Sequence, residues 1–334
     1  MPDRRLPAPA GGSLPAVRRR EQADPEALVT RARAGDPRAL ARLVSLVENA
    51  SGELRQVMKV IAPLAGGARV IGLTGSPGVG KSTVTGALVR SYRAEGLRVG
   101  VLAVDPTSPF SGGALLGDRV RMQEHATDDG VFIRSMASRG HLGGLAWATP
   151  QALRVLDAAG FDVILIETVG VGQAEVQIAA TADTTLVVAA PGMGDSVQAA
   201  KAGVLEIADI FVVNKSDRPG AQDAVRDLRT MLAMARYGPA DWKPPIVSTV
   251  ASAGDGIADL ADAIGRHESW LAESGERDRR RRARAREEVS AIAVTQLRER
   301  LGGLPGGARL EELADRVAVG DIDPYSAADE LIGG

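Results

Sequence analysis

The sequence contains no cysteine and few aromatic residues. The absence of cysteine excludes structural disulfides and thiolate metal sites, and it gives no support for secretion. Aromatic residues make up 3% of the 334 residues and apolar residues make up 45%, so we expect a full core built mainly from Val, Leu, Ile and Ala. A chain of this length forms one large domain with appendages, or two domains.

A strong charge of one sign and long apolar runs are also missing. The formal net charge of −2 gives no overall attraction to nucleic acid or to an anionic membrane. No uninterrupted apolar stretch approaches the roughly 20 residues that a membrane-spanning helix needs, and the N-terminal segment lacks the apolar core of a signal peptide. We therefore expect a cytoplasmic protein that binds neither nucleic acid nor membrane.

A glycine-rich motif follows the apolar residues 70–73 and precedes a helix-compatible segment over residues 81–95. It matches the phosphate-binding pattern G-x-x-x-x-G-K-[ST] and reads Gly75-Ser76-Pro77-Gly78-Val79-Gly80-Lys81-Ser82-Thr83. In this strand–loop–helix setting, loop amides and a helix N-terminus bind phosphate. We expect Lys81 to contact the β- and γ-phosphates of a nucleotide and the Ser82 hydroxyl to bind Mg²⁺.

Apolar segments alternate with helical ones between residues 68 and about 273. Six segments read as strands that are apolar on both faces, at residues 70–74, 99–104, 163–166, 185–189, 210–213 and 246–249. They predict an α/β fold, a P-loop NTPase with a mostly parallel sheet covered by helices on both faces.

Composition divides the chain into four segments, and the predicted P-loop domain spans residues 67–273. Residues 1–24 are rich in Pro, Gly, Ala and Arg and are expected to be a disordered tail. Residues 25–66 have helical spacing that is interrupted at Gly35-Asp36-Pro37, which predicts a helical hairpin with Asp36 as an N-cap. Residues 274–334 are charged and helical, and we interpret their arginine run as a solvated helix face and not as a nucleic-acid site.

Glu167-Thr168-Val169-Gly170 directly follows the predicted strand at residues 163–166. The Glu167 carboxylate can hold Mg²⁺ through water, and the Gly170 N–H can bind a γ-phosphate, so these residues and Lys81 are the predicted catalytic residues. Most GTPases have Asp in place of Glu167. Ras-like GTPases have a water-orienting Gln after the glycine, whereas this chain has Val171, so we expect slow intrinsic hydrolysis.

A guanine-recognition motif ends the predicted strand at residues 210–213. Its Asn214, Lys215 and Asp217 form an N-K-x-D pattern, in which the Asp carboxylate accepts hydrogen bonds from guanine N1–H and from its exocyclic amine. Adenine has no such donor pair, so the motif favours GTP over ATP. Val250-Ala251 follows the next strand, where an Ala N–H can bind guanine O6, although GTPases usually have Ser-Ala there.

Longer motifs resemble one GTPase family. They are Val104-Asp105-Pro106-Thr107-Ser108-Pro109-Phe110-Ser111-Gly112-Gly113, Arg134-Ser135-Met136-Ala137-Ser138-Arg139-Gly140-His141, Glu167-Thr168-Val169-Gly170-Val171-Gly172-Gln173 and Asp323-Pro324-Tyr325-Ser326-Ala327-Ala328. From about residue 27 to its end the chain is similar to the MeaB family, also called ArgK, which includes the methylmalonic aciduria type A protein. Members escort adenosylcobalamin-dependent acyl-CoA mutases.

The resemblance implies roles that the residues alone do not. It implies a Mg²⁺ shell of Ser82, Asp105, Asp118 and Glu167, bound with GTP or GDP. It implies that the segment containing Asp195 and Lys201 is a switch that reports the nucleotide state to the mutase. It also implies that the C-terminal arm forms a homodimer, and that the protein uses GTP hydrolysis to gate adenosylcobalamin loading and to protect the mutase.

Other functions remain open at this stage. A nickel-insertion GTPase of related architecture usually carries Cys or His-rich ligands, and this chain has no cysteine and three scattered histidines. A kinase of a periplasmic binding protein is suggested by an older family name, and a passive binding module is a third alternative. Methylmalonyl-, isobutyryl- and ethylmalonyl-CoA mutases all remain candidate clients.

Overall fold

The computed structural model of the chain describes most of the sequence. The described residues are 24–49, 52–105, 125, 127–137, 148–168, 174–192, 204–300 and 308–333. Except for Asp24, the tail predicted to be disordered lies outside these residues.

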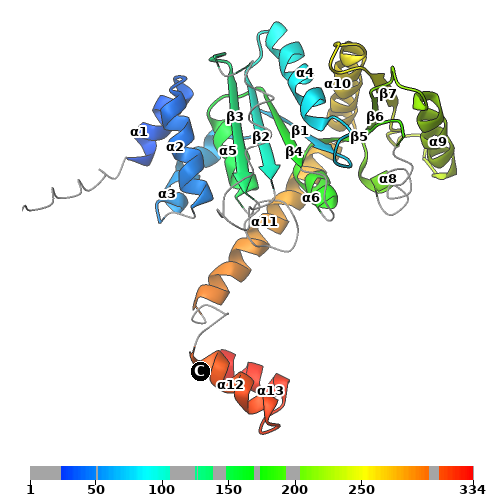
Figure 1. The fold of residues 1–334 in the computed structure, drawn as a ribbon. Helices are drawn as coiled ribbons and strands as arrows, with labels where there is room; N and C mark the ends of the chain where they lie inside the picture. The colour runs from blue at the N-terminus through cyan, green and yellow to red at the C-terminus, as the bar shows by residue number, and fades with distance from the viewer. Residues whose placement is uncertain are drawn as a thin grey trace, which may run out of the picture.

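Seven strands form one sheet in which all neighbouring strands are parallel (Figure 1). Their order across the sheet is β3-β2-β4-β1-β5-β6-β7. The strands are β1 Arg69–Thr74, β2 Val99–Asp105, β3 Val131–Ala137, β4 Val163–Thr168, β5 Thr184–Ala189, β6 Ile210–Asn214 and β7 Ile246–Thr249. The predicted α/β class with a parallel sheet is confirmed.

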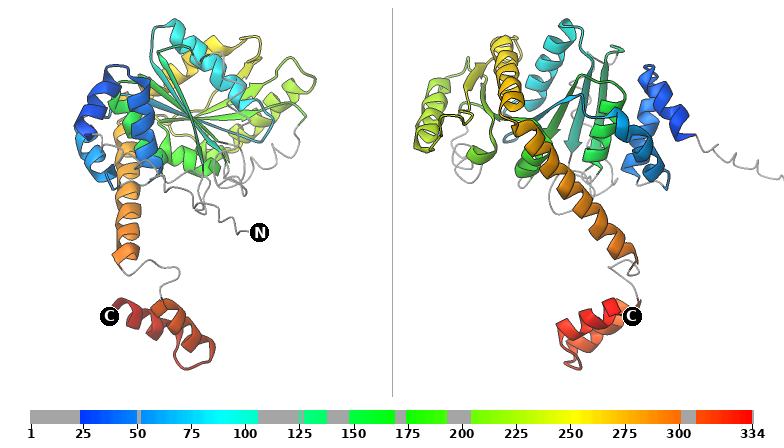
Figure 2. Two further views of the ribbon diagram at one scale, coloured as in Figure 1. Left: turned by 60° about the vertical axis from the view of Figure 1, so that its left-hand side comes forward. Right: turned by 180° about the vertical axis from the view of Figure 1, so that it is seen from behind.

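Helices cover both faces of this sheet (Figure 2). They are α1 Pro25–Arg33, α2 Pro37–Glu48, α3 Leu54–Ile61, the 3₁₀-helix η1 Ala62–Leu64, α4 Lys81–Ala94, α5 Thr149–Ala158, α6 Ala174–Thr181, α8 Val204–Ile207, α9 Ala221–Met234, α10 Ile257–Glu273, α11 Glu276–Arg300, α12 Ala308–Ala318 and α13 Pro324–Gly333. Strand residues alternate between the two cores, so that Leu102 packs with α2 and α5 whereas Val101 packs with α4 and α10. This double burial explains the nearly continuous apolar strands.

The strand β3 was missed by the sequence analysis. All six predicted strands are present, with ends within two residues of those expected. β3 lies at the edge of the sheet beside β2, and its segment includes Arg134 and Ser135, so it does not read as an apolar run. The Arg134 guanidinium donates to the carboxylate of Glu48 in α2, which ties the N-terminal helices to this edge.

The N-terminal segment forms three helices, of which α1 and α2 make the predicted hairpin and α3 was not predicted. The expected break is present, because the Asp36 carboxylate accepts hydrogen bonds from the N–H groups of Arg38 (2.9 Å) and Ala39 (3.2 Å) and caps α2. A second break separates α2 from α3, although buried apolar residues recur on both sides of it. The three helices share one hydrophobic core with α5, so they are part of the main body and not a separate domain.

The side of the sheet on which the chain adds strands changes at β1. The chain adds β2, β3 and β4 on one side of β1, and then β5, β6 and β7 on the other. In open parallel sheets, such a point is where ligands bind, outside the carboxyl ends of the strands. The predicted phosphate loop follows β1 and therefore lies at this position.

Two buried aspartates at the amino ends of the strands, opposite the phosphate loop, bind the basic helix α11. Asp183 precedes β5 and accepts hydrogen bonds from Arg281 (3.2 Å) and Arg284. Asp209 precedes β6, and each of its carboxylate oxygens accepts from Arg280 at 2.9 Å. The two aspartate side chains are 6% and 8% exposed, so the arginines anchor α11 through buried charge.

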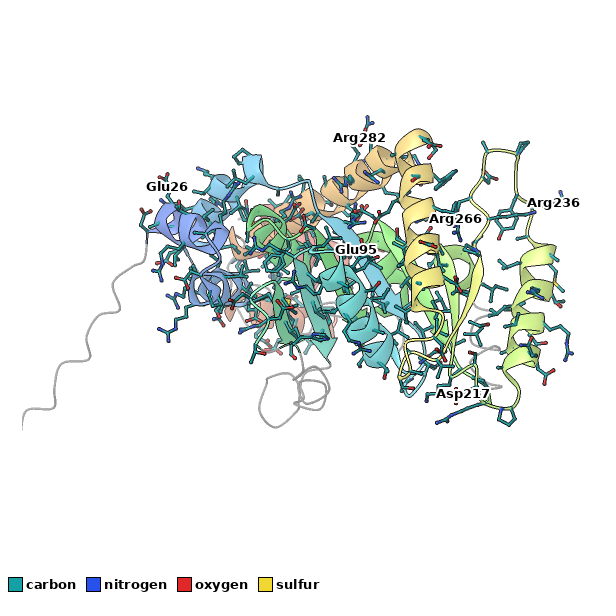
Figure 3. All side chains as sticks on the ribbon, turned by 90° about the horizontal axis from the view of Figure 1, so that it is seen from above. Glu26, Glu95, Asp217, Arg236, Arg266 and Arg282 are labelled. Carbon is teal, nitrogen blue, oxygen red and sulfur yellow. The ribbon has the colours of Figure 1, made fainter. Side chains whose placement is uncertain are left out.

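The arginine run is thus only partly the solvated helix face that the sequence predicted. Arg281 also donates to the backbone carbonyls of Gly66 and Ala68, whereas Arg282 points away from the sheet (Figure 3). The remaining helices α12 and α13 pack against each other, with Leu313 and Ala327 buried. No helix in the described ranges is both long and apolar enough to cross a membrane.

Replacing Asp183 with Asn should lower the free energy of unfolding by about 3 kcal/mol at pH 7, because Arg281 and Arg284 would lose a buried counter-charge. Burial alone would raise the pKa of Asp183, but the charges of Arg284 and Arg281 outweigh it and hold the pKa below its ordinary value of 3.8. The carboxylate therefore stabilises the fold above the unfolded pKa, and this contribution is lost as the pH falls through the folded pKa. Urea unfolding from pH 7 down to pH 2 should show a smaller pH dependence in the variant.

The matched control is Asp223→Asn on α9. Asp223 forms an ion pair with Arg226 in which both side chains are more than half exposed, at 64% and 72%. Exposed pairs contribute little, so a loss below about 0.5 kcal/mol is expected. Equal losses in the two variants would contradict the anchoring role of Asp183.

Candidate functional site

The loop at residues 75–80 joins β1 to α4, and two of its glycines are required by its geometry. Gly75 (φ 138°) and Gly80 (φ 96°) have positive φ angles that L side chains rarely adopt. A Cβ at Gly75 would overlap the backbone carbonyl oxygen of Val188, and one at Gly80 would overlap the side-chain amide of Asn214. The loop therefore packs against β5 and β6 too closely for a side chain at either position.

The helix α4 begins at Lys81, directly after this loop. The first N–H groups of a helix have no partner within it, and they carry the positive end of the helix dipole. With the loop amides beside them, they form an arrangement that favours a phosphate group. The strand–loop–helix setting that the sequence predicted is thus confirmed.

Lys81 is buried, with 6% of its surface exposed. Its Nζ donates to the backbone carbonyls of Gly75 (2.8 Å) and Ser76 (3.1 Å). The side chain therefore turns back over the loop and places its positive charge where the loop amides would bind phosphate. Its contact with a nucleotide phosphate stays a prediction.

Glu167 lies inside β4, next to its last residue, and not after the strand as the sequence analysis placed it. The carboxylate is 5% exposed and faces the start of α4. Its Oε1 accepts a hydrogen bond from Ser82 Oγ at 2.5 Å, and its Oε2 accepts one from Thr85 Oγ1 at 3.0 Å. The structure therefore brings together Ser82 and Glu167, two residues of the predicted Mg²⁺ shell.

Thr85 is the residue that the sequence analysis missed. It lies three residues after Ser82 and therefore on the same face of α4, which is the signal that would have identified it. It is fully buried, and its Oγ1 also lies 3.0 Å from the carbonyl oxygen of Lys81.

Asn214 connects the phosphate loop to the segment after β7. Its Nδ2 donates to the carbonyl of Val79 (2.9 Å), and its Oδ1 accepts from Thr249 Oγ1 (3.2 Å) and from the N–H of Ala251 (3.1 Å). The side chain is buried at 2% exposure. One amide therefore fixes three segments that are far apart in the sequence, and the predicted guanine motif lies directly beside the phosphate loop.

Lys215 makes a second connection to that loop. It is the one described non-glycine residue with a positive φ (57°), and its Nζ donates to the carbonyl of Gly78 at 2.6 Å. The contact with Gly78 carries the Lys215 stem from the guanine motif toward the phosphate loop.

Asp217 is exposed and lies beyond the end of β6, where Figure 3 labels it on the opposite side from Arg282. The neighbouring turn is fixed, because the Ser216 N–H donates to the carbonyl of Thr249 at 3.0 Å. The Ala251 N–H, expected to bind guanine O6, is directed at Asn214 Oδ1, so a bond to a base would share this hydrogen. Val250 pairs with Asp255 and forms the rim of this turn.

Several predicted residues lie outside the part of the chain that the structure describes. They are Asp118, Gly170, Asp195 and Lys201. Asp105 is the last residue of β2, and its backbone pairs with Ala137 of β3. Within the described residues, the contacts of the Mg²⁺ shell are therefore those of Ser82 and Glu167.

Ser82 and Glu167 suit a magnesium ion by their chemistry. Mg²⁺ prefers hard oxygen ligands and keeps several waters, so a hydroxyl can bind it directly and a carboxylate through water. In the described ranges, no group of three or more His, Cys, Asp or Glu side chains gathers where a metal could bind.

Comparison with known proteins identifies the family. Residues 40–304 match the family described as methylmalonyl-CoA mutase-associated GTPase MeaB. A putative GTPase of Pyrococcus abyssi is 51% identical over 313 residues, which cover 92% of this chain and 97% of that protein. The mitochondrial methylmalonic aciduria type A homolog of Mus musculus is 34% identical over 266 residues, covering 78% of this chain and 64% of that protein.

A solved structure agrees with these matches. The crystal structure of a LAO/AO transport system kinase has a TM-score of 0.67 and 26% sequence identity, and the match covers 93% of this chain and 97% of that one. The family match and the relatives span most of the sequence, including the phosphate loop and the guanine motif. The chain belongs to the MeaB family of methylmalonyl-CoA mutase-associated GTPases.

Proposed function

We propose that this protein is a GTP-hydrolysing chaperone that gates adenosylcobalamin loading of an acyl-CoA mutase, methylmalonyl-CoA mutase above all, and protects that enzyme. The observation that carries the nucleotide part is the pair of contacts from Asn214 and Lys215 to the phosphate loop. They hold the guanine-type motif directly beside the phosphate loop. The family description supports the choice of mutase.

Each residue of the site has a role in this proposal. Lys81 and the loop amides stabilise the charge that develops on the transferred phosphate, as positioned donors do in phosphoryl transfer. Ser82 and Glu167, joined by Asp105 and Asp118, would hold Mg²⁺, which neutralises the phosphate oxygens when bound. Asp217 would accept the guanine N1–H and amine.

Hydrolysis is proposed to be slow without a partner. The residue after the switch glycine Gly170 is Val171, where Ras-like GTPases carry the Gln that orients the attacking water. In this proposal the mutase completes the site, and the segment containing Asp195 and Lys201 reports the nucleotide state to it. GTP turnover then acts as a timer for cofactor delivery.

A homodimer formed through α11 to α13 is part of the proposal. The far half of α11 exposes Val289 (67%), Val294 (44%) and Leu297 (56%), well beyond the anchoring arginines. Exposed apolar side chains on one helix are suited to an interface. The guanidinium of Arg154 in α5 donates to Glu288 at 2.6 Å, so the base of the arm is fixed against the body.

The guanine assignment is tested by Asp217→Asn with xanthosine triphosphate. Xanthine has a carbonyl at C2 where guanine has its amine, so an Asn amide can donate to it. We expect GTP to bind roughly tenfold to hundredfold more weakly and xanthosine triphosphate more tightly, since a charge-assisted hydrogen bond contributes about 1.5–3 kcal/mol. Displacement of a fluorescent GDP measures both affinities.

Asp223→Asn is the control, since Asp223 is an exposed residue of α9 away from the guanine motif. It should leave both affinities unchanged. If ATP displaces the fluorescent GDP from the wild-type protein as well as GTP does, the role of Asp217 is wrong.

The chaperone role is tested by GTP hydrolysis with and without methylmalonyl-CoA mutase from the same organism. The isolated protein should turn over at roughly 10⁻⁴ to 10⁻² s⁻¹, in the range of GTPases without an activator. We expect the mutase to raise this rate at least tenfold, and Lys81→Ala to abolish both the basal and the stimulated rate. Phosphate release measures hydrolysis.

The other outcomes favour the alternatives. An unchanged rate would keep the GTPase and exclude this mutase as the client. Transfer of labelled γ-phosphate to a binding protein would support the kinase function. Full protection of the mutase by the Lys81→Ala variant would support a passive binding module.

A further inference from the structure

The Glu167 carboxylate, which is proposed to hold magnesium, also contacts Thr85, a residue that the proposed function does not use. Glu167 accepts hydrogen bonds from two residues of α4, one at each carboxylate oxygen, Ser82 at Oε1 and Thr85 at Oε2. Ser82 has an assigned role as a ligand. Thr85 has none, although it is fully buried beneath the phosphate loop.

The hydroxyl of Thr85 has two acceptors and one hydrogen. Oγ1 lies 3.0 Å from the carbonyl oxygen of Lys81 and 3.0 Å from Glu167 Oε2. The contact with the carbonyl four residues earlier is the usual one for Thr in a helix. A bond to an ionised carboxylate is roughly twice as strong as one to a neutral acceptor, so Glu167 is the favoured partner.

Glutamate needs this second contact more than aspartate would. Its side chain has one more methylene and one more rotatable bond than the Asp that most GTPases carry here. A single hydrogen bond to Oε1 leaves the carboxylate plane free to rotate. A donor at each oxygen, with Ser82 and Thr85 on one face of α4, fixes both the position and the plane of the group.

We infer that Thr85 is a positioning residue for magnesium, which orients the Glu167 carboxylate from below while Ser82 binds the ion. This inference rests on the proposed magnesium–nucleotide site. A magnesium ion would be held by a lone pair of the Ser82 hydroxyl oxygen, and the hydrogen of that hydroxyl could still be donated to Glu167. Thr85 is not a ligand, so it continues to hold Oε2 with and without the metal.

The test is the magnesium dependence of GDP binding in Thr85→Val, which keeps the shape of the side chain and removes the hydroxyl. Release of N-methylanthraniloyl-GDP is followed while free Mg²⁺ is varied. We expect the Mg²⁺ concentration for half-maximal retention to rise roughly tenfold or more, as loss of a ligand-orienting partner does in metal sites. GDP affinity in excess EDTA should not change.

Three further variants separate positioning from a structural effect. Thr85→Ser keeps the hydroxyl and should restore the wild-type midpoint, whereas Thr85→Ala should not, and this pair decides the question even if the Val variant does not fold. Thr230→Val removes a Thr hydroxyl with the same backbone contact, to the Arg226 carbonyl at 2.9 Å, from exposed α9 and should leave the midpoint unchanged. In Glu167→Gln the effect of Thr85→Val should largely disappear.

The results distinguish a failure of the proposed magnesium site from a failure of the role of Thr85. If GDP retention by the wild-type protein does not depend on Mg²⁺, both the magnesium site and the role of Thr85 are wrong. A wild-type response that Thr85→Val leaves intact would overturn the role of Thr85 alone. Equal losses of GDP affinity with and without Mg²⁺, together with a lower Tm, would also overturn it, because they would show a general packing defect.

Discussion

The side-chain amide of Asn214 is the interaction on which the arrangement of the site depends. It bonds to the phosphate loop through Val79 and to the turn after β7 through Thr249 and Ala251. These segments meet because parallel strands bring their carboxyl ends to one edge of the sheet, but the sheet alone does not fix the loops. Asn214 therefore sets the position of the guanine motif relative to the phosphate loop.

The edge of the sheet where the parallel strands end differs in charge from the edge where they begin. At the carboxyl edge, loop amides and Lys81 leave a site that favours an anion. At the amino edge, Asp183 and Asp209 neutralise the arginines of α11. Arg280, Arg281 and Arg284 are paired with these aspartates, so three basic charges of the arm are neutralised at the end of the sheet away from the phosphate loop.

Much of this structure follows from local sequence patterns. The phosphate loop, six strands and the Asp36 cap were predicted, because each depends on residues that are neighbours in the chain. What was missed depends on distant partners: β3 is a strand because β2 lies beside it, and Arg284 pairs with the buried Asp183, 101 residues away. Thr85 had a local signal, its place three residues after Ser82 on α4, but only the fold shows that its hydroxyl reaches the carboxylate of Glu167.

The strand β5 connects the two edges and limits how the protein can respond to a nucleotide. It begins beside Asp183, where α11 is anchored, and near its other end Val188 packs against Gly75 so closely that no side chain fits. A buried strand in the middle of a parallel sheet cannot lengthen or shift register without breaking its pairings with β1 and β6. The arm and the phosphate loop are therefore held at a fixed separation. In the proposed function, nucleotide-dependent change therefore arises in the loops that follow the strands, and the partner that senses the nucleotide binds there.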